Sequence, residues 1–333
     1  MIRTRSSLLC LTGVKLGVFF VVWLTIIGAF LNVGCSDKEQ SKVVDFSNTI
    51  ILERPDTKEQ GNNQLRIAIG AMVSPKESLS TYQELLDYLG EKLGKKIVFK
   101  QRKTYQEINE LLGTGEVDLA FVCSGPYVVG KDKYGLQLLA VPEVNGSHFY
   151  NAYLIVNKDS RFNALEDLRG KTFAFTDPDS NTGKLAPAAW LRKIGEKPET
   201  FFGSFIYTYS HDNSILAVSK GVVDGASVDG LIWEYFSKTN PDITSKTKVI
   251  LKSENYGMPP LVASRQVTDS TKEAIKEALF GMRADKKGAE ILDRLMIDRF
   301  VAAKDDWYNS IRAVLESSGT SMETKNGFSK PQD

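Results

Sequence analysis

Short β-type runs alternate with helical stretches from Gln64 onward. The run Leu65–Ala71 is β-like, and in the following stretch, Tyr82–Leu93, leucines recur on one helical stripe that Gly94 ends. The alternation continues with two more strands and one more helix: Lys96–Lys100, Val117–Val122, and Tyr105–Leu112 ended by Gly113. This βαβαβ order predicts a parallel sheet with right-handed crossovers.

The second half of the chain repeats the same alternation. Its strands and helices are expected at Tyr153–Val156, Thr172–Phe175, Leu185–Ile194, Ser204–Tyr207, Asn213–Lys220 and Val223–Val228. The pattern therefore predicts two α/β lobes of similar size. The tail Asp269–Ser317 is expected to be chiefly helical, with two apolar faces, and to pack back onto the first lobe.

The N-terminal segment is typical of a sorting signal. Basic residues precede a long apolar run that ends in small residues before Cys35, so residues 1–35 are interpreted as a secretion signal outside the fold. Gly34-Cys35 resembles a bacterial lipobox with cleavage before a lipidated Cys35, although Asn32 stands where that motif has leucine. An uncleaved membrane anchor is the alternative, and either one places the remainder outside the cytoplasm. Residues 36–63 are mostly polar and predict a tether.

Composition narrows the possible functions. Of 333 residues, 42% are hydrophobic and 25% charged, which is typical of a globular protein. Beyond the signal, 39 basic and 41 acidic residues argue against a nucleic-acid partner. Cys10, Cys35 and Cys123 lie far apart and the chain has only His148 and His211, so neither a metal site, a cofactor nor a disulfide framework is predicted. Cys123 is expected to be a small buried hydrophobic residue.

The segment Phe173–Gly183 carries the candidate chemistry. A β-type run changes there to small hydroxyl and amide residues just where a helix is expected to begin. A helix start offers unpaired N–H groups and the positive end of its dipole, and Ser180, Asn181 and Thr182 add side-chain donors. The segment therefore predicts an oxyanion cradle, with simple helix capping as the alternative.

The order of the motifs carries a family resemblance. The matching motifs are Asp118-Leu-Ala-Phe, Gly125-Pro-Tyr, Asn145-Gly-Ser-His-Phe-Tyr, Leu165-Glu-Asp-Leu-Arg-Gly-Lys, Asp177-Pro-Asp-Ser-Asn-Thr-Gly, and Ser210-His-Asp-Asn leading to Ala217–Asp224. In this order, residues 64–300 resemble the substrate-binding proteins of phosphonate, phosphite and phosphate ABC transporters. The resemblance implies a two-lobed, type II periplasmic-binding-protein fold. Each lobe would be a mostly parallel sheet flanked by helices, and the lobes would be joined by hinge strands.

The same resemblance implies the ligand-binding residues. The family's hydroxyl triplet matches Ser180, Asn181 and Thr182, its two binding tyrosines match Tyr105 and Tyr150, and its histidine matches His211. His211 is expected as a protonatable donor, and a capping role beside Asp212 is the alternative. Catalysis by Ser210, His211 and Asp212 is excluded, because neighbours in sequence point apart.

The nature of the ligand is an expectation from individual positions. Leu231 and Met258 stand where binders of aminoalkylphosphonates have acidic residues, so phosphate, phosphite or a simple alkylphosphonate is favoured, although Asp229 lies close by in sequence. Asp177 or Asp179 either faces the ligand as an acceptor or favours the helix start.

The resulting hypothesis is a non-enzymatic lipoprotein at the periplasmic or extracellular face. Lobe 1 is expected at 64–152, lobe 2 with the cradle at 153–257, and the return to lobe 1 with C-terminal helices at 258–333. As a monomer it would capture a small oxyanion by lobe closure and deliver it to ABC transporter permease subunits. A ligand sensor on a membrane anchor and an enzyme are the alternatives.

Overall fold

The computed structural model describes residues 63–70, 72 and 74–317, with only the backbone for 75–81. All of these residues belong to one unit of the chain, Asp56–Asp333. The predicted signal 1–35, its lipidation site Cys35 and nearly all of the tether 36–63 lie outside the described residues. Within the described ranges, no helix combines the length and the apolar character that crossing a membrane requires.

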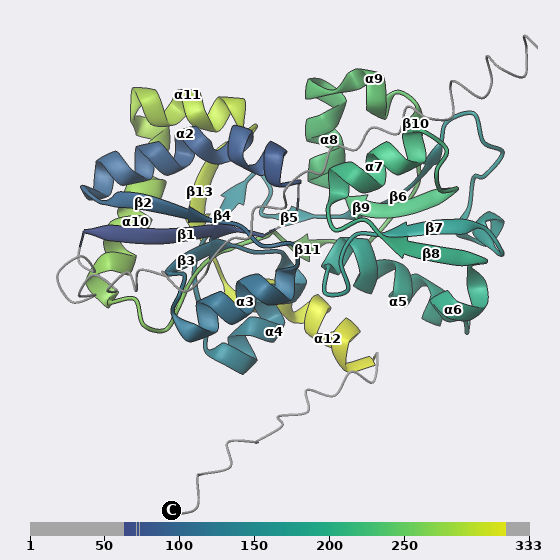
Figure 1. Cartoon of the computed structure of the whole chain (residues 1–333), viewed down its shortest axis with the longest axis horizontal. Helices are drawn as coiled ribbons and strands as arrows, with labels where there is room; N and C mark the ends of the chain where they lie inside the picture. The colour runs from purple at the N-terminus through teal and green to yellow at the C-terminus, as the bar shows by residue number, and fades with distance from the viewer. Residues whose placement is uncertain (1–62, 71, 73, 318–333) are drawn as a thin grey trace, which may run out of the picture. The chain divides into compact units, whose positions relative to one another are not determined.

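The first sheet has six strands (Figure 1). In their order across the sheet they are β13 (Arg299–Ala302), β4 (Gln137–Glu143), β12 (Leu261–Ala263), β3 (Leu119–Phe121), β1 (Gln64–Ile69) and β2 (Lys96–Lys100). β1 is parallel to β2 and β3, whereas β12 is antiparallel to β3 and β4, and β13 is antiparallel to β4. The sheet is therefore mixed, where a mostly parallel one was predicted. The reason is that β4 leads the chain out to the second sheet and β12 brings it back, so the two run in opposite directions.

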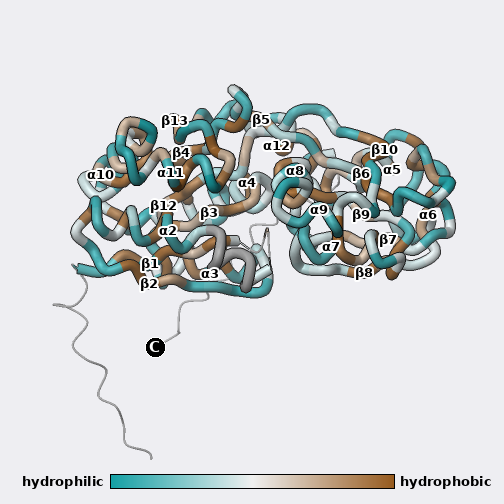
Figure 2. The backbone as a smooth tube through the Cα atoms, turned by 90° about the horizontal axis from the view of Figure 1, so that it is seen from above, coloured by the Kyte–Doolittle hydropathy of each residue, from teal (hydrophilic) through white to brown (hydrophobic). Residues whose placement is uncertain are grey.

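Helices cover both faces of this sheet. The helices on one face are α2 (Pro75–Leu93), α10 (Asp269–Phe280) and α11 (Lys286–Arg294), and those on the other are α3 (Tyr105–Thr114) and α4 (Ser124–Tyr134). Alternation along β1 sends Ile67 and Ile69 toward the first set and Ala68 toward the second, as the two-residue period of a strand requires. In Figure 2 the hydrophobic residues accordingly gather in the interior elements.

Two of the predicted helices end at a glycine in the left-handed conformation. α2 ends at Gly94, as predicted, and this residue has a left-handed φ of 60°. The end of α3 was predicted at Gly113 but lies later, because the left-handed residue is Gly115 with φ 77°. Gly113 is instead a packing position, since a Cβ atom there would lie 2.3 Å from the ring of Tyr134.

The second sheet has five strands, again of mixed direction. In their order across the sheet they are β10 (Thr247–Lys252), β6 (Ala152–Asn157), β9 (Gly225–Asp229), β7 (Thr172–Phe175) and β8 (Ser204–Tyr207). The helices of this part are α5 (Ala186–Lys193), α6 (Pro198–Phe201), α7 (His211–Ser219), α8 (Gly230–Thr239) and α9 (Pro241–Thr244). Phe173 and Phe175 of β7 pack on the side of α5, while Ala174 faces α7 and α8. Below, lobe 1 and lobe 2 denote the first and second sheet with their helices.

The chain passes between the lobes through a small antiparallel ribbon. It consists of β5 (Phe149–Tyr150) and β11 (Tyr256–Gly257), with Tyr150 opposite Tyr256. The predicted helical tail contains one strand, β13, which completes the first sheet, and ends in α12 (Asn309–Ser317). Short 3-10 turns lie at Leu165–Leu168, Met282–Ala284 and Asp305–Tyr308. The Tyr308 hydroxyl donates to the Met258 carbonyl at 2.7 Å, which ties the tail to the returning chain.

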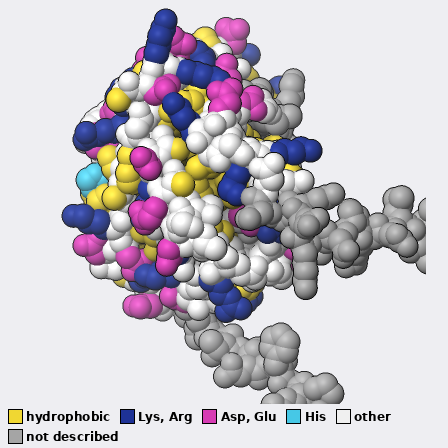
Figure 3. Space-filling view, turned by 90° about the vertical axis from the view of Figure 1, so that its left-hand side faces the viewer, with side chains coloured by type: hydrophobic (Ala, Val, Ile, Leu, Met, Phe, Trp, Pro, Cys, Tyr) yellow, Lys and Arg dark blue, Asp and Glu magenta, His cyan; other side chains and the backbone are white. Residues whose placement is uncertain are grey.

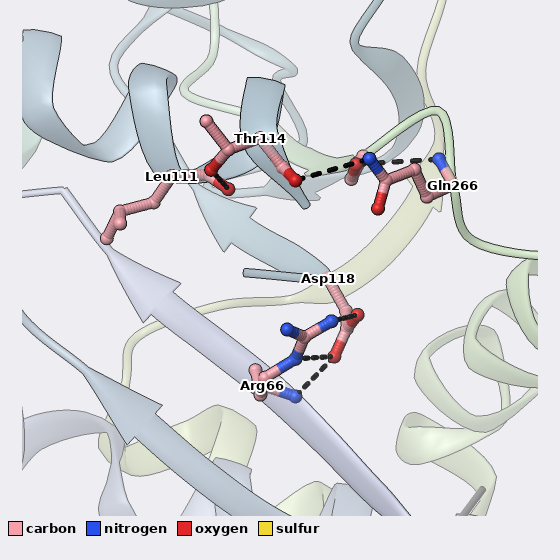
Figure 4. Close-up of polar contacts among 6 residues, drawn as sticks. Arg66, Leu111, Thr114, Asp118 and Gln266 are labelled. Atoms are coloured by element: carbon pink, nitrogen blue, oxygen red, sulfur yellow. Dashed lines mark hydrogen bonds and ion pairs between the residues drawn. The ribbon is translucent and has the colours of Figure 1, made fainter. Parts of the chain in front are cut away.

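Asp118 has a structural role in lobe 1. Its carboxylate accepts hydrogen bonds from the Arg66 backbone N–H at 2.7 Å and from the guanidinium Nε at 3.0 Å and Nη2 at 2.6 Å (Figure 4). Close by, Gln266 donates to the Thr114 carbonyl at 3.3 Å. Through its bonds to Arg66, Asp118 holds the start of β3 against β1. Elsewhere on the surface, basic and acidic side chains are intermixed over the face in Figure 3.

Replacing Asp118 with alanine should lower the free energy of unfolding by about 1–2 kcal/mol, measured by urea denaturation. The change leaves the Arg66 N–H and guanidinium without their acceptor, but partial exposure of the pair limits the loss. Glu290→Ala, on the exposed side of α11, is the matched carboxylate deletion and should change stability by less than about 0.5 kcal/mol. An equal loss in both variants would contradict this role.

Candidate functional site

The segment predicted as the cradle lies where β7 ends and the next helix begins. Ser180 caps this start, because its hydroxyl oxygen accepts the Gly183 N–H at 3.0 Å. Asn181–Leu185 then makes one π-helical turn, labelled η4, which continues into α5 with Pro187 in its first turn. Gly183 is required here, since a Cβ atom would lie 2.4 Å from the Thr176 hydroxyl. The Ser180 oxygen is thus used by the cap, and its proton remains available to donate.

Residues of lobe 1 and the crossing meet this cradle directly. The Asn181 side-chain N–H donates to the Tyr150 hydroxyl at 3.3 Å. The Cys123 sulfur lies against the Asn181 N–H and the Tyr150 hydroxyl, and burial raises the pKa of its thiol to about 11. Gly125, in the first turn of α4, approaches so closely that a Cβ atom would lie 2.6 Å from the Asp179 carbonyl. Cys123 is buried, as predicted, but it lines the site.

His211 holds its ring in a single protonation state. Its Nδ1 accepts the Asp229 backbone N–H at 3.0 Å and lies 3.1 Å from the Thr176 hydroxyl. Because a backbone N–H can only donate, Nδ1 carries no proton, and Nε2 must carry it. Burial lowers the pKa of His211 to about 3. The histidine is therefore a neutral donor, where a protonatable one was predicted.

Ser210 and His211 begin α7 in a constrained conformation. The preceding residue, Tyr209, has a left-handed φ of 59°, which is uncommon for a side chain of this size. Tyr209 is held by a hydrogen bond from its N–H to the Thr176 carbonyl at 2.7 Å, and the Lys103 ammonium lies 4.2 Å from its ring centre. These contacts orient the start of α7 toward the cradle.

The buried polar atoms of this region have unused hydrogen-bonding capacity. Across the described residues, seven buried side-chain atoms have no hydrogen-bond partner, and five of them belong to Tyr105, Asn181, Thr182, Ser210 and His211. We call these five residues the donor cluster, although Asn181 contributes an oxygen. Unpaired buried polar groups cost about 1–3 kcal/mol each, so their concentration in one place points to a bound polar ligand.

Two carboxylates of lobe 2 bind helix starts of lobe 1. The Asp177 carboxylate accepts the N–H of Tyr105, the first residue of α3, at 3.2 Å, and the Asp179 N–H at 2.8 Å. Asp212 accepts the Ser74 N–H at 2.8 Å, directly before α2. Burial raises the pKa of Asp177 to about 6. Asp177 therefore binds a helix start, but it is that of α3 on the opposite lobe and not the adjoining one that was considered in the sequence.

Asp229, whose backbone N–H bonds to His211, carries a buried carboxyl group. It caps α8 by accepting the Leu231 N–H at 2.8 Å and the Ile232 N–H at 3.4 Å. Burial raises the pKa of Asp229 to about 7, despite these bonds. This carboxyl therefore keeps its proton to a higher pH than an exposed aspartate does.

The electrostatics of the site come from neutral groups. No lysine or arginine is fully buried anywhere in the described part of the chain. Lys184, next to Gly183, lies over the Phe175 ring at 4.0 Å, on the aromatic side of β7. Within the part of the chain that the structure describes, no group of three His, Cys, Asp or Glu side chains is placed to hold a metal ion. An anion here would be bound by neutral hydrogen bonds and helix dipoles.

Comparison with known proteins identifies the family. The family model described as the periplasmic substrate-binding protein of a phosphonate ABC transporter matches residues 67–308. The chain belongs to this family. It is 26% identical over 265 residues to the phosphonates-binding periplasmic protein of Escherichia coli K12, with 78% of each chain covered. It is 31% identical over 164 residues to the phosphate-import protein PhnD of Mycolicibacterium smegmatis, covering 46% of this chain and 51% of the relative.

Solved structures of the family agree with the fold. A binding protein of a phosphonate ABC transporter from Pseudomonas aeruginosa superposes with a TM-score of 0.72 and 25% identity, covering 75% of this chain and 85% of that one. PhnD1 from Prochlorococcus marinus, in complex with methylphosphonate, gives 0.70 and 19%, covering 77% and 98%. The predicted type II periplasmic-binding-protein fold is thereby confirmed.

All six residues that the family resemblance marked lie buried around one place. Tyr105, Tyr150, Ser180, Asn181, Thr182 and His211 are each at most 2% exposed. Sequence reasoning missed Ser210 and Asp229 as parts of the site, and it assigned Cys123 to packing alone. The predicted helix Asn213–Lys220 begins three residues after Ser210, so no local signal marked this serine. In the structure α7 begins at His211 and Ser210 directly precedes it, but the serine hydroxyl makes no capping bond.

Thr182→Val should leave the free energy of unfolding of the ligand-free protein unchanged or raise it by up to about 1 kcal/mol. The reason is that the Thr182 hydroxyl is buried without a partner among the described residues, so its removal breaks no bond. Ser180→Ala should instead lower stability by about 1 kcal/mol, because it removes a cap. Urea denaturation of both variants tests this difference. Equal losses would mean that Thr182 has a structural partner.

Proposed function

We propose that this protein is the extracytoplasmic solute-binding component of an ABC importer and captures a small phosphorus oxyanion. The candidate ligands are phosphate, phosphite and an alkylphosphonate. The observation that carries the proposal is the donor cluster, whose buried groups have no partner among the described residues. Family membership supports it, because relatives bear names for phosphonate binding and phosphate import.

The cluster offers several groups that donate hydrogen bonds, and an oxyanion accepts them. Hydroxyls of Tyr105, Thr182 and Ser210 can each donate a proton, and His211 donates from Nε2. Hydrogen bonds to a charged acceptor contribute about 1.5–3 kcal/mol each, roughly twice a neutral bond. A tetrahedral oxyanion offers enough lone pairs to accept all of them.

Lobe closure would couple ligand binding to transport. Lobe 1 contributes Tyr105 and lobe 2 contributes Thr182 and His211, so a ligand that binds all three favours the form in which the lobes touch. Direct contacts between the lobes support that form. The backbone N–H of His211 donates to the Met72 carbonyl at 2.9 Å, and the Asp177 carboxylate accepts the backbone N–H of Tyr105. The permease subunits would then recognise the closed form, with the monomer held at the membrane by a lipid on Cys35.

Substitutions in the donor cluster should weaken anion binding strongly. In calorimetry of the full-length protein in detergent, Thr182→Val and Tyr105→Phe should each raise the Kd for methylphosphonate by about tenfold or more, because each removes one bond to the anion. Ser160→Ala is the matched control. Its hydroxyl is also buried without a partner among the described residues, but it lies outside the cluster.

The Ser160 variant should bind like the unaltered protein. Absence of binding to phosphate, phosphite and methylphosphonate in the unaltered protein would contradict the proposed function. Equal effects of all three substitutions would contradict the assignment of the site.

Binding should also take up a proton through Asp229. An anion beside this carboxyl raises its pKa above the ligand-free value of about 7, so affinity should fall as the pH rises from 7 to 8.5. The titratable groups around it, Tyr82, Tyr105, Cys123 and Tyr150, stay neutral because burial raises their pKa values. Glu234 is the remaining acidic neighbour.

Asp229→Asn keeps an oxygen for the α8 cap and should remove the part of the pH dependence that Asp229 causes. The measurement is the ratio of the Kd of the unaltered protein to the Kd of the variant at each pH, because the ligand's own ionisation cancels in this ratio. Calorimetry in two buffers of different ionisation enthalpy counts the proton directly. Proton uptake that is unchanged in Asp229→Asn would assign it to another group.

A further inference from the structure

An apolar cavity of about 110 Å³ lies next to the donor cluster. Side chains of both lobes line it, chiefly aliphatic and aromatic ones, among them Phe121 and Phe300 from lobe 1 and Leu231 and Ile232 from lobe 2. Asp229 is the one charged residue of the lining. Such a lining disfavours water and favours hydrocarbon.

The cavity is joined to the donor cluster through two residues. Met72 lines the cavity, and its carbonyl accepts the backbone N–H of His211 at 2.9 Å. Asp229 also lines it, and its N–H donates to His211 Nδ1 at 3.0 Å. Two residues of the cavity lining are thus hydrogen-bonded to His211, the residue whose Nε2 would donate to the oxyanion.

The polar neighbours of the cavity limit what it can take. It shares Val144, Leu231, Tyr235 and Leu295 with a second hollow whose lining includes Asn145, Glu234 and Lys238. Hydrocarbon that extended past the shared residues would meet polar side chains and solvent. An apolar cavity of ~150 Å³ holds the six carbons of benzene, so this one accommodates about four.

We propose that the cavity receives the hydrocarbon substituent of an organophosphonate whose oxyanion is bound by the donor cluster. The inference rests on the proposed function and narrows its ligand: alkylphosphonates of about three to five carbons bind more tightly than phosphate, phosphite or 2-aminoethylphosphonate. An ammonium group would enter a lining that is hydrocarbon apart from the Asp229 carboxyl, and burial, which raises the pKa of this carboxyl, also disfavours a second buried charge beside it.

A chain-length series tests this directly. Calorimetry of the full-length protein in detergent should give Kd values that fall about fourfold per methylene from methyl- to butylphosphonate, because each added methylene leaves water. The gain should stop at hexylphosphonate, and 2-aminoethylphosphonate should bind more weakly than propylphosphonate. A flat or rising Kd along the series, with phosphite or methylphosphonate still bound, would overturn the inference and leave the proposed function standing. Failure of every phosphorus oxyanion to bind would overturn both.

Substitution of Leu231 locates the effect. Leu231→Phe adds bulk to the cavity and should abolish the gain from methyl to butyl while changing the Kd for methylphosphonate by less than about twofold. Ile194→Phe is the matched control, since Ile194 is 42% exposed and outside the cavity lining, and it should retain the full gain.

An enlarged cavity provides the complementary test. Leu231→Ala should move the preferred chain length from butyl toward hexyl, which loss of folding cannot imitate. A full gain that persists in Leu231→Phe, together with an unmoved optimum in Leu231→Ala, would place the substituent elsewhere and overturn the proposal.

Discussion

The hydrogen bond from the Asp229 N–H to His211 Nδ1 determines the chemistry of the site. It fixes the ring proton on Nε2 and so makes a buried histidine a neutral donor rather than a cation or an acceptor. The same bond joins the end of β9 to the start of α7 and brings a carboxyl beside the donor cluster. Because the interior excludes water, each donor left unpaired there raises the free energy of the ligand-free state, and an anion that accepts from all of them relieves it.

Binding by uncharged donors would affect which anions the site selects. A site with buried lysine or arginine would attract any anion, whereas hydroxyls, an imidazole N–H and helix starts require acceptors in particular directions. The Asn181 oxygen adds an acceptor, which would favour an anion that still carries a proton. The adjoining apolar cavity adds selection by the substituent on phosphorus, so charge, proton count and hydrocarbon length would be distinguished by separate groups.

Each lobe contributes different residues to this site. Lobe 2 supplies the capped π turn at Ser180 and the start of α7, both held by local bonds. Lobe 1 supplies Tyr105, and the crossing ribbon supplies Tyr150. Asp177 and Asp212 bind helix starts of the opposite lobe, so the contacts that close the site are themselves electrostatic and short in range. In the proposed transport cycle, opening of the lobes would break these bonds.

The sequence by itself determined the alternation of strands and helices and the polar helix start at Ser180–Thr182. The family resemblance marked Tyr105, Tyr150 and His211, which the structure buries. These depend on local periodicity, capping preferences and motif order, which a linear chain displays. Only the tertiary structure decided the mixed sheets, the histidine tautomer, the part played by Asp229 and the apolar cavity. Each of these depends on segments distant in sequence, such as Leu231 beside Phe121 and Asp177 beside Tyr105. Burial and hydrogen-bond partners come from such long-range contacts, and no local pattern of residues specifies them.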